Sequence, residues 1–202
     1  MKDEVMKDKV VLSILQELGW KCGKDEAGDV YCQLEQGGKQ LQIIPTIRKL
    51  SDHFRVSLMP SISTKEFSAA AAQIFGEPID HEPIIVSNLR DEKIPSVARE
   101  DVVRLAERAL SWASMQDVEA GLAAYRSLPT DAKGARPLRH LAALALSGDV
   151  GRLHGYKESF DQGDRMGFVP YITAKMIERA ISIAQENAEV SRPHCPRVIS
   201  KP

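Results

Sequence analysis

The longest run of helix signals lies in residues 137–184, and this run constrains the fold more than any other stretch of the chain. Apolar residues recur at helical spacing and stop at Gly148, where a left-handed cap would end a first helix. Asp149 is placed to cap a second helix. Pro170 predicts the start of a third helix, because proline at the first helical position forfeits no hydrogen bond. The C-terminal half is therefore expected to be all-helical.

The same stretch partly repeats the segment that precedes it. Three side chains reappear one hairpin later with similar chemistry: Leu122, Tyr125 and Arg126 correspond to Leu153, Tyr156 and Lys157. This register predicts a pair of helical hairpins of the tetratricopeptide type. A plain helical bundle would give a similar pattern, so both arrangements stay open.

The N-terminal half carries signals of a sheet with covering helices. Residues 3–18 have an apolar face at helical spacing and end at Gly19, which predicts an amphipathic helix. Gly37 and Gly38 predict a hairpin turn, because glycine accepts a positive φ without a Cβ clash. Residues 53–62 alternate between apolar and polar side chains, which predicts one strand. Its expected core side chains are Phe54, Val56, Leu58 and Ile62.

A second helix is expected after this strand. Ser63 and Glu66 have the spacing of a capping box, and Gly76 marks the end of the apolar face, which should include Phe75. Residues 84–89 predict a buried strand, and a long helix should follow from about residue 97. The expected fold class is α+β: an antiparallel or mixed sheet with covering helices, followed by a helical bundle or a short hairpin repeat. The expected domains are 1–95 and 96–189, with a disordered tail at 190–202.

The composition limits which cellular compartment and which classes of partner we expect. The 202 residues carry a net charge of -1, which argues against electrostatic binding to nucleic acid or to a membrane. Cys22, Cys32 and Cys195 are odd in number and lack metal-ligand spacing. We therefore expect no intrachain disulfide and a reducing compartment. The N-terminal residues lack the apolar core of a signal peptide, which favours a cytoplasmic protein.

The sequence contains no recognisable catalytic, cofactor or metal motif. Phosphate-binding, dinucleotide-binding, zinc-protease and hydrolase patterns are all absent from it. His81 and Glu82 lie in a proline-bounded loop, where simple exposure is favoured over a catalytic pair. His140 and His154 lie on neighbouring predicted helices, but no further ligand accompanies them. We expect no catalytic residue, no metal and no cofactor.

The order of elements over residues 3–115, with the glycine hairpin at 37–38 and the cap at 63–66, resembles the α/β fold of type III secretion chaperones and related bacterial domains. That family usually has another strand before its last helix, where this chain has only RDEKI, and it lacks a helical extension like residues 117–187. The resemblance implies a protein-binding role, with a homodimer as one arrangement. No functional residue is carried over from it.

The densest basic cluster stands where the helix after residue 135 begins. It includes Lys133, Arg136, Arg139 and His140, and Arg165 and Tyr171 lie in the next interhelical loop. Because Arg and Tyr combine contact area with directional hydrogen bonds, these two segments are a candidate binding surface for an acidic or aromatic partner segment. Solvated charge without a partner is the alternative. The expected function is a non-enzymatic protein-binding module, such as a chaperone-like adaptor or an immunity-type protein. The alternative is an enzyme of unrecognised family with a pocket between the two halves.

Overall fold

The computed structural model describes residues 2–25 and 27–190, and this part of the chain contains seven helices and eight strands. Contacts divide the chain into two compact units. The first comprises Met1–Ser68 with His81–Leu122, and the second comprises Ala69–Asp80 with Ala123–Pro202. Every described strand belongs to the first unit, and the described part of the second is helical, so the predicted α+β class is confirmed.

The units do not follow the expected division at residues 95 and 96. The helix α3 (Arg99–Ser114) contributes Val102, Leu105 and Ala109 to the core of the first unit, so it belongs with the sheets rather than with the helical half. The segment 69–80, in contrast, belongs to the helical unit. The tail expected at 190–202 lies outside the described residues beyond its first position.

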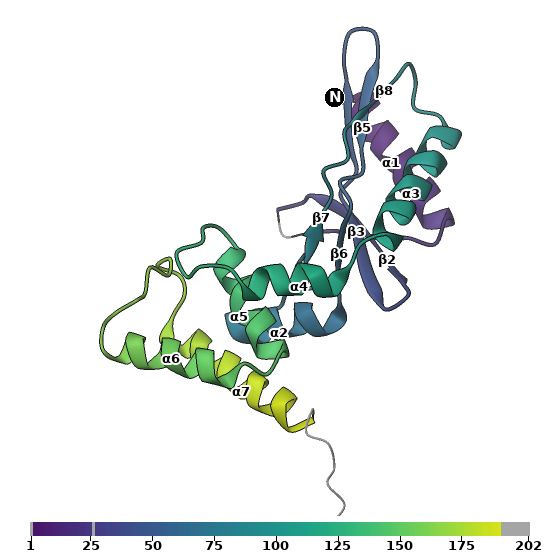
Figure 1. Ribbon diagram of the computed structural model, residues 1–202. Helices are drawn as coiled ribbons and strands as arrows, with labels where there is room; N and C mark the ends of the chain where they lie inside the picture. Colours follow the sequence, from purple (N-terminus) through teal and green to yellow (C-terminus); the bar gives the residue numbers. More distant parts are fainter. Residues whose placement is uncertain (1, 26, 191–202) are drawn as a thin grey trace, which may run out of the picture. The chain divides into compact units, whose positions relative to one another are not determined.

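The first unit contains two antiparallel sheets (Figure 1). The five-stranded sheet has the order β1-β2-β3-β6-β7, and its strands are β1 (Lys21–Lys24), β2 (Val30–Gln36), β3 (Lys39–Ile43), β6 (Ser61–Ser63) and β7 (Ile85–Val86). The three-stranded sheet has the order β4-β5-β8, and its strands are β4 (Thr46–Lys49), β5 (Phe54–Ser57) and β8 (Glu92–Ile94).

The turn between β2 and β3 has the predicted chemistry. Gly37 and Gly38 have φ angles of 57° and 78°, so both occupy the left-handed region that a two-residue hairpin turn requires. The prediction of a hairpin at this position is confirmed. The turn sets the register of Leu34 opposite Leu41, which places both side chains on the core face.

The prediction of a single strand over residues 53–62 is wrong, because the extended strand is interrupted between Ser57 and Ser61. Met59 has a φ of 41°, and Pro60 has no amide hydrogen to donate to a ladder. The segment therefore forms β5 in one sheet and β6 in the other. Ser57 and Ser61 are buried, although alternation places them on the predicted solvent face.

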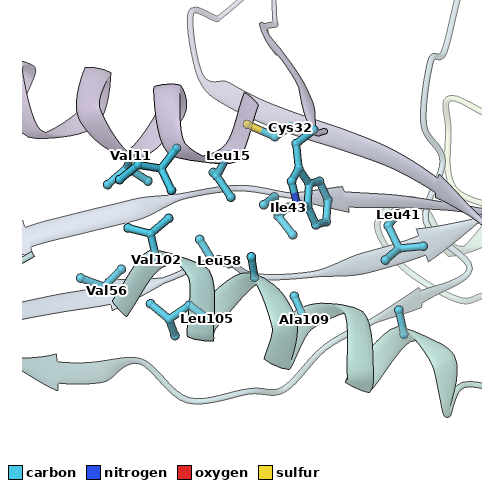
Figure 2. Packing of buried hydrophobic residues seen from close by; sticks show 14 of the residues in the cluster. Val11, Leu15, Cys32, Leu41, Ile43, Val56, Leu58, Val102, Leu105 and Ala109 are labelled. Carbon is cyan, nitrogen blue, oxygen red and sulfur yellow. The ribbon is translucent and has the colours of Figure 1, made fainter. Parts of the chain in front are cut away.

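The core of the first unit lies between α1 (Lys2–Glu17), α3 and the sheets. Figure 2 shows Val11 and Leu15 of α1 and Val102 of α3 directed at the same apolar cluster. The predicted burial of Phe54, Val56 and Leu58 is confirmed, with exposed fractions of 7%, 1% and 5%. Burying a large aliphatic side chain contributes about 1.5 to 3 kcal/mol, so this cluster accounts for much of the unit's stability.

The prediction that no intrachain disulfide forms is wrong. Cys22 and Cys32 are bonded across β1 and β2, where the register makes them direct partners. An odd cysteine count does not reveal such a pair, because only strand pairing brings the two residues together. The inference of a reducing compartment loses its basis, since disulfides persist mainly in oxidising surroundings. Cys195 lies outside the described residues.

The helix α2 (Lys65–Phe75) forms as expected, but its start has different chemistry. Thr64, not Ser63, caps the helix, because the amide of Phe67 donates to Thr64 Oγ1 at 3.1 Å. Phe75 is 40% exposed rather than part of the buried face. The buried strand expected at 84–89 shortens to the two residues of β7, because only that segment pairs with β6. In the described part of the chain, no helix is long and apolar enough to cross a membrane.

The helical unit consists mainly of α5 (Arg136–Leu146), α6 (Val150–Asp161) and α7 (Ala174–Val190), while α4 (Val118–Arg126) begins in the first unit. The cap predicted at Asp149 is confirmed, because its carboxylate accepts from the Arg152 amide at 3.2 Å. The helix start predicted at Pro170 is wrong: Thr173 caps α7, and its hydroxyl accepts from the Met176 amide at 3.3 Å. The hairpin repeat stays a prediction.

Candidate functional site

Two loops of the helical unit, residues 127–135 and 162–173, lie side by side and carry most of the predicted site. Tyr171 Oη donates to the carbonyl of Gly134 at 2.9 Å, and the Thr130 hydroxyl donates to the carbonyl of Met166. A Cβ placed at Gly167 would lie only 3.0 Å from Cβ of Asp131, so the loops approach closely where glycine stands. The sequence argument that the start of α5 and the loop before α7 meet is therefore confirmed.

Arg165 is exposed, and its side chain fixes the shape of the second loop. Its guanidinium donates to the carbonyls of Val169 and Ile172 at 2.9 and 2.7 Å. The guanidinium carbon also lies 5.1 Å from the centroid of the Phe160 ring, within cation–π range. These contacts satisfy carbonyls that a helix would otherwise satisfy, so Arg165 is a structural residue of the loop.

Arg139 is likewise engaged within the helical unit. It is half-buried on α5 and donates to Tyr125 Oη at 3.2 Å. Its guanidinium carbon lies 5.9 Å from the centroid of the same ring. Arg139 therefore connects α5 to the end of α4.

His140 is completely buried, which removes it from the predicted surface. Its Nδ1 lies 2.8 Å from the Tyr125 carbonyl, which can only accept, so Nδ1 carries the proton. Its Nε2 then accepts from Tyr156 Oη at 3.0 Å. Burial lowers the pKa of His140, against the opposing effect of its hydrogen bond to the carbonyl. Burial also raises the pKa of Tyr156, so both side chains stay neutral.

We call four of the exposed side chains on the paired loops and at the start of α5 the loop surface: Lys133, Arg136, Met166 and Tyr171. Met166 and Tyr171 are 38% and 40% exposed. Among the described residues, no ion-pair partner faces Lys133 or Arg136. Arg136 is the first residue of α5, whose first turn contains no acidic residue, so its charge adds to the positive end of the helix dipole.

The loop at His81, expected to be simply exposed, is fastened to the five-stranded sheet. His81 Nε2 lies 3.0 Å from Ser61 Oγ on β6. The amide of Glu82 donates to Ser68 Oγ at 3.1 Å, and its carbonyl accepts from Ser63 Oγ at 2.6 Å. Ser61 is 7% exposed, so this contact fastens the loop to β6 at a buried position.

The described residues of the first unit line cavities that include two of about 300 Å³. One is lined by Gly19, Lys21, Gln33, Leu34, Glu35 and Gln40. The other is lined by Val11, Leu12, Gly28, Asp29, Val30, Pro45, Thr46 and Ile47. No group of three metal-ligating side chains occurs in residues 2–25 and 27–190.

A model of a family of unknown function, DUF6990, matches residues 7–185, which is most of the chain. The chain belongs to this family. None of the curated proteins matches it, and no solved structure does. Membership of DUF6990 therefore assigns neither an activity nor a partner, and the function has to be argued from the geometry.

Proposed function

We propose that this DUF6990 protein is a non-enzymatic protein-binding module and that the loop surface binds an acidic segment of its partner. The observation that carries the proposal is the pair of fastened loops that present two unpaired cations beside an exposed tyrosine. Binding residues are often placed on loops that a rigid scaffold positions. The fold supports the proposal through its helical unit, which fixes both loops.

Preorganisation is the first argument for binding at this surface. The hydrogen bond from Tyr171 to Gly134 and the bond from Thr130 to Met166 join the two loops, while Arg165 fixes the second loop internally. A surface that is already ordered loses less conformational entropy when a partner binds. The contacts of Arg165 therefore support binding indirectly, by holding the shape of the loop.

Charge is the second argument. Lys133 and Arg136 lie near the positive end of α5, where cations are unfavourable unless an anion offsets them. A carboxylate-rich segment would offset both charges, and Tyr171 and Met166 supply apolar contact area beside them. This combination favours an acidic segment with at least one apolar residue.

Affinity capture with the purified protein, followed by calorimetry on the isolated partner, tests the proposal. The variant Lys133→Glu/Arg136→Glu should weaken binding by about tenfold or more, since reversed charges at an interface repel the partner. The matched control Lys9→Glu/Lys24→Glu changes the net charge equally at exposed sites of the first unit and should bind normally. Unchanged affinity in the first variant would contradict the proposal, as would turnover of a metabolite by the purified protein.

Three finer expectations stay predictions. The chaperone-like character and the homodimer rest on the resemblance of residues 3–115 to type III secretion chaperones. The cytoplasmic location also stays a prediction, and the Cys22–Cys32 disulfide argues against it.

A further inference from the structure

The three-stranded sheet presents three cations in one cross-strand row. The register pairs Arg48 of β4 with Arg55 of β5, and Arg55 with Lys93 of β8. Side chains directly opposite each other point to the same face and lie about 5 Å apart at Cβ. All three are exposed. We call this set the basic row.

The rest of the sheet does not neutralise the basic row. Glu92, next to Lys93, points to the opposite face, where it accepts from Arg108 at 2.6 Å and also from Arg104. Asp52 lies at the hairpin tip and pairs with His53 at 2.6 Å, which leaves Asp91 as the remaining flanking carboxylate. None of the three cations has an ion-pair partner among the described residues.

Like charges directly opposite each other destabilise a sheet, so the row weakens the isolated fold. An anionic partner would attract all three cations, so binding would turn this repulsion into a net stabilisation. We propose that the basic row is a docking site for an acidic helix of a partner protein, independent of the loop surface. The two surfaces lie on different units, so either can fail without the other.

Spacing favours a helix as the occupant. The row spans two interstrand distances, roughly 10 Å, with a cation about every 5 Å. Carboxylates three or four residues apart on a helix are about 5 to 6 Å apart, whereas alternate residues of an extended strand are roughly 6.6 Å apart. A helix with glutamates at i, i+4 and i+7 therefore matches the row more closely than an extended peptide does.

The surroundings of the row disfavour other polyanions. Surfaces for single-stranded nucleic acid interleave cations with aromatic rings on which bases stack. The aromatic side chain of β5, Phe54, is buried on the opposite face. Binding at an anionic membrane would require several apolar anchors beside the cations. Among the described residues of the hairpin tip, Leu50 alone is a large, exposed apolar side chain, so a membrane is disfavoured.

The row is also placed where a helix could reach it. Figure 1 shows β5 and β8 extending past the five-stranded sheet within the first unit. Ser57, at the inner end of the same face, is buried, so the accessible part of the face is the projecting part that carries the row.

Fluorescence anisotropy with a labelled alanine-based helical peptide, bearing glutamate at i, i+4 and i+7, tests the proposal. The full-length protein should bind this probe at low salt, and binding should weaken as the Debye length falls to about 10 Å near 0.1 M salt. The variant Arg48→Gln/Arg55→Gln/Lys93→Gln should bind about tenfold more weakly or worse. The same peptide with glutamine in place of glutamate should not bind.

The matched control Lys9→Gln/Lys24→Gln/Lys175→Gln removes the same charge at other exposed positions and should retain the probe. Equal losses in both triple variants would show a net-charge effect and overturn the proposal. If the row variant still binds the peptide and Lys133→Glu/Arg136→Glu does not, the peptide binds at the loop surface. That result would also overturn the proposal. Tighter row-dependent binding of oligothymidylate or of phosphatidylserine vesicles would show that the ligand class is wrong. Circular dichroism melting confirms that each variant is folded.

Discussion

The arginines of the helical unit and the cations of the three-stranded sheet have similar chemistry but opposite surroundings. Arg165 donates to two backbone carbonyls of its own loop, and Arg139 donates to Tyr125. Arg48 and Arg55 stand opposite each other on an exposed face without an ion-pair partner among the described residues. Arg139 and Arg165 thus hold loops and helices of the helical unit together, whereas the cations of the basic row remain available to a partner.

The comparison shows that the density of positive charge along a sequence does not identify a binding surface. The cluster at 133–140 is the denser one, yet Arg139 and His140 in it are occupied by internal contacts. The basic row is spread over residues 48–93 and is assembled by strand pairing. Because a guanidinium can donate five hydrogen bonds, nearby carbonyls and rings decide whether it serves the fold or a ligand.

The largest effect should come from His140, the polar centre of the helical unit. Replacing it by leucine removes both hydrogen bonds: the Tyr156 hydroxyl loses its buried acceptor, and the Tyr125 carbonyl loses one of its donors but keeps the Leu128 amide at 3.2 Å. An unsatisfied buried group costs about 1 to 3 kcal/mol, so His140→Leu should lower the free energy of unfolding by about 2 to 4 kcal/mol. Urea denaturation followed by circular dichroism measures the change.

The exposed His154 provides the matched control, because His154→Leu should change stability by less than about 0.5 kcal/mol. The free energy of unfolding as a function of pH gives a second measurement. The folded pKa of His140 lies below its ordinary 6.5, so the neutral form stabilises the fold above that pH, and this contribution declines as the pH falls below 6.5. The loss of stability at low pH should be smaller in His140→Leu than in the unsubstituted protein. Identical pH profiles for the two proteins would mean that His140 lies in solvent.

The next largest effect concerns the covalent link in the sheet unit. Reducing the Cys22–Cys32 disulfide, which joins residues 10 apart, should lower stability by about 2 to 3 kcal/mol through loop-closure entropy in the unfolded chain. Unfolding curves with and without dithiothreitol measure this difference. Alkylation of the unfolded, unreduced protein should label Cys195 alone, and labelling of all three cysteines there would show that the bond is absent.

Arg165 and Arg136 test the comparison within the helical unit. Arg165→Ala should destabilise the protein by about 1 to 2 kcal/mol, because the carbonyls of Val169 and Ile172 lose a charged donor. Arg136→Ala should change stability by less than about 0.5 kcal/mol, since its side chain is exposed. Thermal melting of both variants provides the measurement. Equal melting temperatures would mean that Arg165 is as free as Arg136 and would remove the contrast with the sheet.

The smallest effect should come from the centre of the basic row. Arg55→Glu places a carboxylate directly opposite Arg48 and Lys93, which replaces two repulsive cross-strand pairs by attractive ones. The protein should gain about 0.2 to 1 kcal/mol in stability, measured by urea denaturation at low salt. Lys24→Glu, at an exposed position on another strand, should show no such gain. A loss of stability in Arg55→Glu would indicate that Arg55 has an internal partner.

Local patterns predicted several features of the fold correctly. The helical face before Gly19, the glycine pair at 37–38 and the cap at Asp149 all depend on neighbours within one or two turns of chain. The burial of Phe54, Val56 and Leu58 follows from alternation. The site was harder to predict: the sequence indicated that the two loops meet, but it placed the half-buried Arg139 and the buried His140 on the surface.

The sequence by itself determined the elements and their inward faces, because backbone propensity, capping and hydrophobic periodicity act over a few residues. Tertiary structure decided the split of residues 54–63 between two sheets, the bond between Cys22 and Cys32, and the assembly of the basic row. Each of these depends on which strands pair, and pairing is fixed by contacts between distant segments. For the same reason only the folded chain determines which cations are occupied by carbonyls and rings and which remain on the surface.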